Sequence, residues 1–291
     1  MRSLLFVPGD DSRKLEKALT SGADALILDL EDSVAPDAKA MARQTCLDFL
    51  QSTIPEDGRP ALYVRINALD NGLSDSDLDS VMTAGPDGIV LPKATSGSDI
   101  SLLDARIAVR EALHELDDGR TRIIAIATET AASIFGLGSY AGASLRLAGL
   151  TWGGEDLAAD IGAAANKDGD GMWTRPFQLA RSLCLFGAVA AGVTPIDTVF
   201  TDFRDLDGLR REASDAARDG FCGKLAIHPQ QVAVINEVFT PSPEAIAEAR
   251  RIVDAFRRAG DPGVVGLNGR MLDRPHLVAA QRTLNRAGLA D

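Results

Sequence analysis

The chain has 291 residues, of which 45% are hydrophobic and 25% are charged, so it is long enough for one large α/β domain with a full core. Its formal net charge is -12, which repels the phosphates of nucleic acids and of anionic membranes. The longest apolar stretch, residues 183–193, is too short to span a bilayer. We therefore expect neither a nucleic-acid-binding protein nor a membrane protein.

Eight short apolar runs occur along the chain, and each ends in a charged residue or a turn. In chain order they are residues 4–7, 25–28, 62–64, 89–91, 123–127, 145–152, 198–200 and 225–227. Helical spacing of apolar residues follows most of them, for example over residues 98–116. This alternation predicts parallel βαβ units, and eight units predict a (β/α)8 TIM barrel with its chemistry at the C-terminal ends of the strands.

Two regions depart from this alternation. Residues 162–172 are rich in Gly, Asp and Ala, but the spacing does not match a calcium-binding loop, so we expect a solvated loop at the barrel mouth. Beyond the eighth unit, Ser242 and Pro243 open a new helix, and a Gly/Pro-rich segment separates it from a last helix. We expect a catalytic barrel over residues 1–240 and a helical extension or lid over residues 241–291.

The three cysteines are odd in number and lack Cys-x-x-Cys spacing, which is typical of reduced thiols in a cytoplasmic protein. A strand pattern begins almost at the first residue, so no signal peptide is visible. No glycine-rich nucleotide loop and no Gly-x-Ser-x-Gly motif is present, so the sequence supports neither nucleotide-loop chemistry nor a serine hydrolase.

Glu129 and Asp156 follow the fifth and sixth predicted strands, so both carboxylates are expected at one side of the barrel mouth. Two hard oxygen ligands with open positions suit Mg2+, with Mn2+ as a possible substitute, and no His/Cys cluster favours zinc. Ion pairs with nearby Arg or Lys residues are the structural alternative.

Arg65 and Lys93 follow the third and fourth predicted strands. A guanidinium at Arg65 suits a carboxylate or a developing enolate, whereas the structural alternative is a salt bridge to Asp29, Glu31 or Asp32. Lys93 could form a Schiff base, but an ion-paired lysine is the favoured interpretation.

Three further candidates have an ordinary structural interpretation. His228 follows the eighth run and could transfer protons, although a histidine that is only hydrogen-bonded there is favoured. Arg13 and Lys17 lie one helical turn apart and could hold a phosphate, or form a plain charged helix face. Asp273 precedes the last helix, where an acid is favourable on helix-dipole grounds alone.

Several segments together resemble the citrate lyase β-subunit family within the HpcH/HpaI aldolase group, which includes malyl-CoA and citramalyl-CoA lyases. The segments run nearly end to end: RSLLFVPG at 2–9, DLEDSV at 29–34, VRIN at 64–67, LPK at 91–93, ET at 129–130, WGGEDLAADIG at 152–162, IDTVF at 196–200, DFRD at 202–205, GK at 223–224, IHP at 227–229 and MLDRP at 271–275. Each segment is weak alone, and their number and order carry the resemblance.

The resemblance implies a role for each matching position. Glu129 and Asp156 would bind Mg2+, Arg65 would bind substrate and stabilise an enolate, and Asp273 would be an acid/base on a lid from a neighbouring subunit. We expect Gly154 and Glu155 to contact substrate together with Arg65, Glu129 and Asp156. The expected coenzyme A contacts are Phe6, Arg13, Lys17, Ile227 and His228. Thr128 and Gly154 depart from the residues that many relatives carry there, which leaves the substrate open.

The implied activity is Mg2+-dependent cleavage of a 3-hydroxyacyl-CoA of the citryl, malyl or citramalyl type to an acyl-CoA and a 2-oxo acid, in a homotrimer or hexamer. Two alternatives remain from the sequence. One is a 2-oxo acid aldolase that does not use coenzyme A, and the other is a citrate lyase β subunit that works only with a carrier protein.

Overall fold

The computed structural model describes residues 1–289. The chain divides into two compact units, Met1–Asn236 and Glu237–Asp291. The first unit is built on eight parallel strands that close into a barrel, with β8 hydrogen-bonded to β1. The strands are β1 (Ser3–Pro8), β2 (Ala25–Asp29), β3 (Ala61–Arg65), β4 (Gly88–Leu91), β5 (Arg122–Ile126), β6 (Leu147–Thr151), β7 (Thr194–Asp197) and β8 (Gly223–Ala226). The prediction of a TIM barrel is confirmed.

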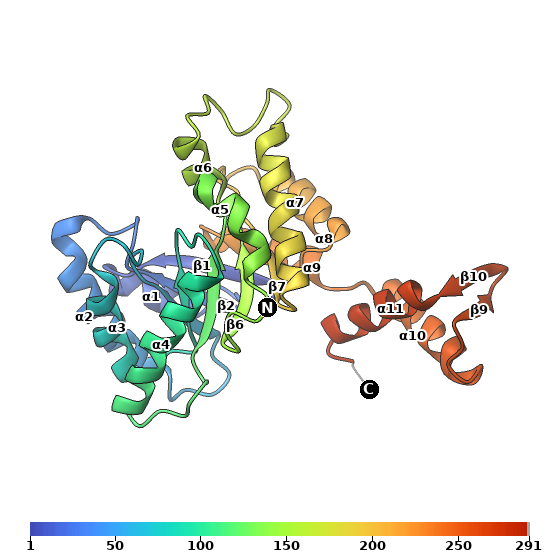
Figure 1. The fold of residues 1–291 in the computed structure, drawn as a ribbon, viewed down its shortest axis with the longest axis horizontal. Coiled ribbons are helices and arrows are strands. Elements are labelled where there is room, and N and C mark those ends of the chain that lie inside the picture. The colour runs from blue at the N-terminus through green and yellow to red at the C-terminus, as the bar shows by residue number, and fades with distance from the viewer. Residues whose placement is uncertain (290–291) are drawn as a thin grey trace. The chain divides into compact units, whose positions relative to one another are not determined.

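Helices connect successive strands and lie outside them (Figure 1). They are α1 (Ser12–Ala18), α2 (Lys39–Thr53), α3 (Ser74–Val81), α4 (Gly97–Leu113), α5 (Ala131–Gly136), α6 (Gly154–Asp160), α7 (Arg175–Ala190), α8 (Leu206–Asp219) and α9 (Pro229–Phe239). Three 3-10 turns, Pro36–Ala38, Met82–Ala84 and Leu137–Ser139, adjoin α2, α3 and α5. No helix within residues 1–289 is both long enough and apolar enough to cross a membrane.

The interior of the barrel is filled by side chains from strands all round it. A single buried cluster contains residues from seven of the eight strands, β6 being the exception. Because these strands lie on all sides of the barrel, their side chains can meet only at its axis. The cluster consists of Leu4, Ala25, Ile27, Tyr63, Val90, Ile124, Ile126, Ile196 and Leu225. The barrel is therefore a packed core, and open space for a substrate exists only beyond the strand ends.

The seventh strand is displaced from the predicted position. The apolar run at 198–200 predicts a strand that leads into Asp202, but β7 is Thr194–Asp197, which ends before that run begins. Ile196 belongs to the barrel core, and Asp197 is buried beside Lys224 of β8, its partner in the strand register. The prediction was wrong because a buried, charge-paired aspartate interrupts the apolar pattern that marks a strand.

The second unit contains helix α10 (Pro243–Arg258), a two-stranded antiparallel hairpin of β9 (Val264–Leu267) and β10 (Arg270–Asp273), and helix α11 (Arg274–Arg286). The Ser242 hydroxyl accepts a hydrogen bond from the N–H of Ala245, so Ser242 caps α10 as predicted. The hairpin was missed, because the segment was interpreted as a loop. Asn268 and Gly269 both have positive φ at its tip, and Asn-Gly between apolar residues is a strong hairpin signal.

Candidate functional site

Glu129 and Asp156 lie near each other beyond the ends of β5 and β6. Glu129 follows β5 by three residues, and Asp156 is in the first turn of α6. Lys93, which follows β4, reaches both of them. Its backbone N–H donates to Glu129 Oε2, and its Nζ lies 3.7 Å from Asp156 Oδ1.

Glu129 is almost fully buried. Its side chain accepts the backbone hydrogen bond from Lys93, but no salt bridge to it is present among residues 1–289. Burial raises the pKa of Glu129 to about 8, and the negative charges of Asp156 and Glu31 also raise it. A carboxyl in this state gains most from a cation placed beside it.

The arrangement fits a small divalent cation. One carboxylate is buried and the other is 38% exposed, and they lie close enough for the charge of Asp156 to raise the pKa of Glu129. Mg2+ is commonly held by one or two carboxylates and keeps its other positions for water and substrate oxygens. Within residues 1–289 no group of three or more His, Cys, Asp or Glu side chains forms a complete metal cage. Glu129 and Asp156 would therefore hold such an ion only in part.

Arg65 ends β3 and is fixed by two acids, Asp29 at the end of β2 and Glu31 in the loop that follows. Its Nε and Nη2 donate to the two oxygens of Asp29, both at 2.7 Å, and Nη1 lies 2.9 Å from Glu31 Oε2. Burial alone raises the pKa of Asp29, but the hydrogen bonds and charge of Arg65 lower it below its usual value. The predicted salt bridge of Arg65 is confirmed, and the bidentate grip leaves Nη1 on the side away from Asp29.

Glu31 connects Arg65 to Lys93. Its Oε1 lies 2.5 Å from Lys93 Nζ, and its buried Oε2 has no donor in good hydrogen-bond geometry, although Arg65 Nη1 is within salt-bridge distance. Burial of Lys93 lowers its pKa, but the hydrogen bond and charge of Glu31 outweigh that effect and raise the pKa above its ordinary value. A lysine held as an ammonium is a poor nucleophile, which disfavours a Schiff base at Lys93.

Two consecutive glycines make room for neighbouring side chains, Gly153 for Glu129 and Gly154 for Trp173. A Cβ placed on Gly153 would lie 2.7 Å from Glu129 Cγ, so only glycine leaves room for this side chain. The N–H of Gly153 also donates to Thr128 Oγ1 at 3.1 Å. Gly154 opens α6 and packs against Trp173, and the neighbouring Glu155 is exposed and accepts from Asn166 Nδ2 at 2.8 Å.

The expected coenzyme A contacts fall in two groups. Phe6 of β1 lies beside the site, with its ring 4.8 Å from the Arg65 guanidinium, whereas Arg13 and Lys17 are exposed on α1. Ile227 and His228 follow β8, and the His228 ring stacks on Phe203 with a centroid separation of 4.7 Å. Its Nδ1 accepts the backbone N–H of Gln230 at 3.2 Å.

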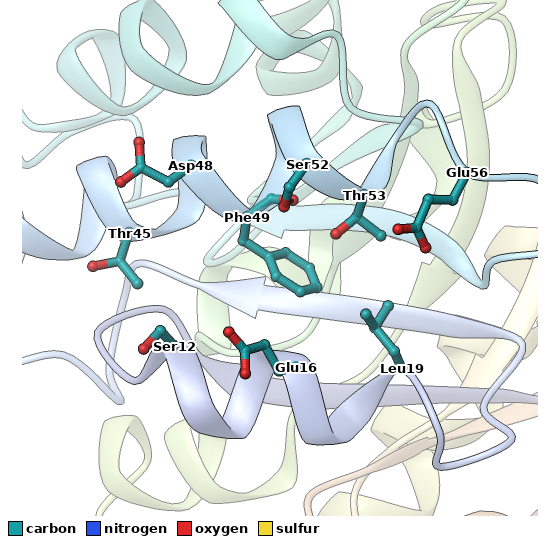
Figure 2. Close-up of a pocket in the computed structure, with 9 residues that line it drawn as sticks. All are labelled: Ser12, Glu16, Leu19, Thr45, Asp48, Phe49, Ser52, Thr53 and Glu56. Carbon is teal, nitrogen blue, oxygen red and sulfur yellow. Dashed lines mark hydrogen bonds between the residues drawn. The ribbon is translucent and has the colours of Figure 1, made fainter.

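A hollow of about 530 Å³ lies between α1 and α2, on the outside of the barrel (Figure 2). Its lining consists of Ser12, Glu16, Leu19, Thr45, Asp48, Phe49, Ser52, Thr53 and Glu56. Three of these side chains are carboxylates and none is basic, so the hollow repels the phosphates of a nucleotide. It contains none of the predicted site residues.

Asp273 lies at the end of β10 in the second unit, where it is the N-cap residue of α11. The helix-start interpretation of its position is therefore confirmed. Its Oδ1 lies 2.5 Å from His276 Nδ1, and the side chain is 52% exposed. His276 is thus a direct neighbour of the expected acid/base.

Sequence reasoning underestimated Lys93 and Glu31. Glu31 was named only as an ion-pair candidate, and an ion pair was the favoured interpretation of Lys93. In the structure Lys93 contacts Glu31, Glu129 and Asp156, and Glu31 also contacts Arg65. The available signal was their position, since each follows a barrel strand. The hydrogen bond from the backbone N–H of Lys93 to Glu129 could not be predicted from the spacing of residues in the sequence.

The fold agrees with comparisons to known proteins. Residues 2–229 match the family model described as HpcH/HpaI aldolase/citrate lyase, and residues 179–290 match one described as a C-C bond lyase of the TIM-barrel fold. The chain belongs to the HpcH/HpaI aldolase/citrate lyase family.

Among its relatives are two proteins of Cereibacter sphaeroides. A (3S)-malyl-CoA thioesterase is 35% identical over 98% of this chain and 94% of that protein, and an L-malyl-CoA/beta-methylmalyl-CoA lyase is also 35% identical, with the same coverage. The crystal structure of CitE from Mycobacterium tuberculosis with magnesium, acetoacetate and coenzyme A is 33% identical, with a TM-score of 0.77. The similarity covers 99% of this chain and 98% of that one.

Proposed function

We propose that this protein is a Mg2+-dependent carbon–carbon lyase that cleaves a 3-hydroxyacyl-CoA to an acyl-CoA and a 2-oxo acid. The observation that carries the proposal is the buried Glu129 carboxylate beside Asp156, with an Arg65 guanidinium fixed on the same barrel mouth. Malyl-CoA and β-methylmalyl-CoA in the name of a relative, and magnesium and coenzyme A in a related crystal structure, support this substrate class.

Glu129 and Asp156 would hold the metal ion, which when bound polarises the oxygens of the 2-oxo acid half and stabilises negative charge on them. The 3-hydroxyl group would lose its proton to solvent water, its oxygen would form a carbonyl, and the bond between C2 and C3 would break. The released electron pair becomes the enolate of the acyl-CoA. Arg65 is held by Asp29 and Glu31 before substrate arrives, so its guanidinium is already oriented and can stabilise this charge.

Asp273 would complete the reaction as an acid that protonates C2 of the enolate, and as a base in the condensing direction. The exposed side chain on the second unit is suited to arrive after substrate has bound. His276 contacts the same carboxylate and would orient it.

The remaining parts of the proposal concern binding and assembly. Gly154 and Glu155 would contact the 2-oxo acid half, and Arg13 and Lys17 would bind the phosphates of coenzyme A on an otherwise acidic protein. Phe6, Ile227 and His228 would line its path. We place the protein in the cytoplasm, which agrees with three free cysteines, and propose a homotrimer or hexamer in which Asp273 serves a neighbouring subunit.

The test is turnover of citryl-, malyl-, β-methylmalyl- and citramalyl-CoA by the purified protein, with Mg2+ and with EDTA. We expect Mg2+-dependent formation of an acyl-CoA and a 2-oxo acid from at least one thioester. Glu129→Gln and Asp156→Asn should each lower kcat/KM at least about a hundredfold, because both remove a charge that holds the metal. Asp57→Asn, an exposed change in the loop before β3, should have no effect.

Other products contradict the proposal in recognisable ways. Free coenzyme A and an intact hydroxy acid would indicate a thioesterase. Cleavage of free hydroxy-oxo acids, with no activity on thioesters, would indicate an aldolase that does not use coenzyme A. Activity only after addition of an acyl carrier protein would indicate a citrate lyase β subunit.

A further inference from the structure

Lys93 has an unusual backbone for a lysine. Its φ is 52°, in the left-handed region that L-residues other than Gly, Asn and Asp seldom adopt. In this conformation the N–H of Lys93 points to Glu129 and its side chain extends to Glu31. One residue therefore contacts both a proposed metal ligand and the acid that pairs with Arg65.

The ammonium of Lys93 lies among acids. Its Nζ is 2.5 Å from Glu31 Oε1, 3.6 Å from Asp32 Oδ2 and 3.7 Å from Asp156 Oδ1. Within residues 1–289 it is the one basic group at salt-bridge distance from Asp156. The Lys93 ammonium therefore places a positive charge beside Asp156, as a metal ion bound to Asp156 also would.

We propose that Lys93 is a tethered counter-ion that holds Asp156 and Glu31 in place before metal arrives and then competes with the divalent cation for them. This inference rests on the proposed function, because it takes Asp156 as a metal ligand. Lys93 is in this sense a positioning residue, which keeps the acidic site assembled and at the same time limits its affinity for the metal.

Competition between Lys93 and the metal ion predicts the direction in which metal affinity changes when Lys93 is replaced. An ammonium near a bound divalent cation repels it, so removal of that charge strengthens metal binding. The side chain of Lys93 is 34% exposed, so water and salt screen part of the repulsion and the change should be modest. A residue that only supported the fold of the site would give the opposite result, since its loss would disorder Asp156 and weaken binding.

The experiment is calorimetric titration of the full-length protein with Mg2+ alone, without substrate. Lys93→Met removes the ammonium and keeps most of the stem, and Lys93→Gln removes the charge but still offers an N–H donor to Glu31. Both should lower the Kd for Mg2+ about three- to tenfold. Lys93→Arg keeps the charge and should stay within about twofold of the unmodified protein. Lys14→Met, an equal loss of charge on exposed α1, is the matched control.

The outcomes separate this inference from the proposed function. Tighter binding in both neutral variants, with unchanged circular dichroism, supports the tethered counter-ion. Equal or weaker binding in a folded neutral variant, while the unmodified protein binds Mg2+, overturns the inference alone. No Mg2+ binding by the unmodified protein overturns the proposed metal site and the inference with it.

Discussion

Glu129 can occupy its position because Gly153, in the loop after β6, has no side chain. Gly153 has φ of -114°, which any residue adopts, so its backbone does not require glycine. What requires glycine is the approach of Glu129 Cγ, 2.7 Å from where a Cβ would be. Steric fit, rather than backbone freedom, therefore explains the first glycine of this Trp-Gly-Gly segment.

Gly153→Ala should displace Glu129 and leave the fold intact. The added methyl group forces the carboxylate away from Asp156, and a misplacement of about 1 Å can cost roughly a hundredfold in rate. We expect kcat/KM to fall ten- to a hundredfold on the best thioester, with a weaker Kd for Mg2+. Gly138→Ala is the control, because nothing lies within 4 Å of its added Cβ. A Gly153→Ala variant with ordinary kinetics would show that Glu129 is not held by this contact.

At the scale of residues, the sequence predicted which charged side chains gather at the barrel mouth, but not the contacts between them. Glu129, Asp156 and Arg65 were identifiable because acids and bases directly after buried strands gather at one end of a barrel. The resemblance to a known family then supplied their expected roles. The left-handed backbone of Lys93 was not predictable, because lysine has no preference for it and only the surrounding contacts impose it.

A buried ion network joins three elements beneath the barrel mouth. Lys224 of β8 is fully buried, with Nζ at 2.6 Å from Asp197 Oδ2 and 2.9 Å from Glu212 Oε1 on α8. The other oxygen of Asp197 accepts from Trp152 Nε1 at 2.8 Å. Burial raises the pKa of Asp197, but the charges of Lys224 and Arg181 lower it below the usual value. The network therefore ties the residue before Gly153 to β7, β8 and α8.

Lys224→Met should destabilise the protein by about 3–5 kcal/mol, because it leaves the Asp197 carboxylate buried without its cation. Urea unfolding followed by circular dichroism measures this loss. The double variant Lys224→Met with Asp197→Asn should cost less than Lys224→Met alone, since no buried charge is then unpaired. Arg218→Met, an exposed change on α8, is the control. A loss below about 1 kcal/mol for Lys224→Met would contradict the account of a buried pair.

The same network explains why the position of β7 was predicted wrongly from the sequence. Strand patterns were identified wherever the strand is apolar throughout, as in β2, whose residues are all buried. β7 contains Pro195 and the buried Asp197, so the more apolar run at 198–200 was preferred. The charge on Asp197 is compatible with a buried strand only because Lys224 lies beside it, and that pairing across strands is not visible in local sequence.

At the scale of the whole molecule, the proposed catalytic groups are divided between two compact units. Glu129 and Asp156 belong to the unit Met1–Asn236, and Asp273 belongs to Glu237–Asp291, on a hairpin and helix with their own small core. The sequence predicted an extension beyond the barrel, because a barrel of eight units is already closed before it. Asp273 could act at the barrel of its own chain or of a neighbouring subunit. The choice depends on how the subunits assemble, and no local sequence pattern predicts that.

Mixed oligomers of two inactive variants test whether sites are shared between subunits. Glu129→Gln lacks the metal ligand and Asp273→Asn lacks the acid/base, so each should be inactive alone; full activity of Asp273→Asn would exclude its role. If Asp273 reaches a neighbouring subunit, co-expressed chains carrying different tags form some sites with both groups intact, about a quarter for random mixing around a ring. Doubly purified oligomers all contain both variants, so we expect turnover of about a third of the unmodified rate for a trimer and about a quarter for a ring of six. Oligomers of one variant with two tags are the control, and mixed oligomers without turnover would place Asp273 and Glu129 of each site in the same chain.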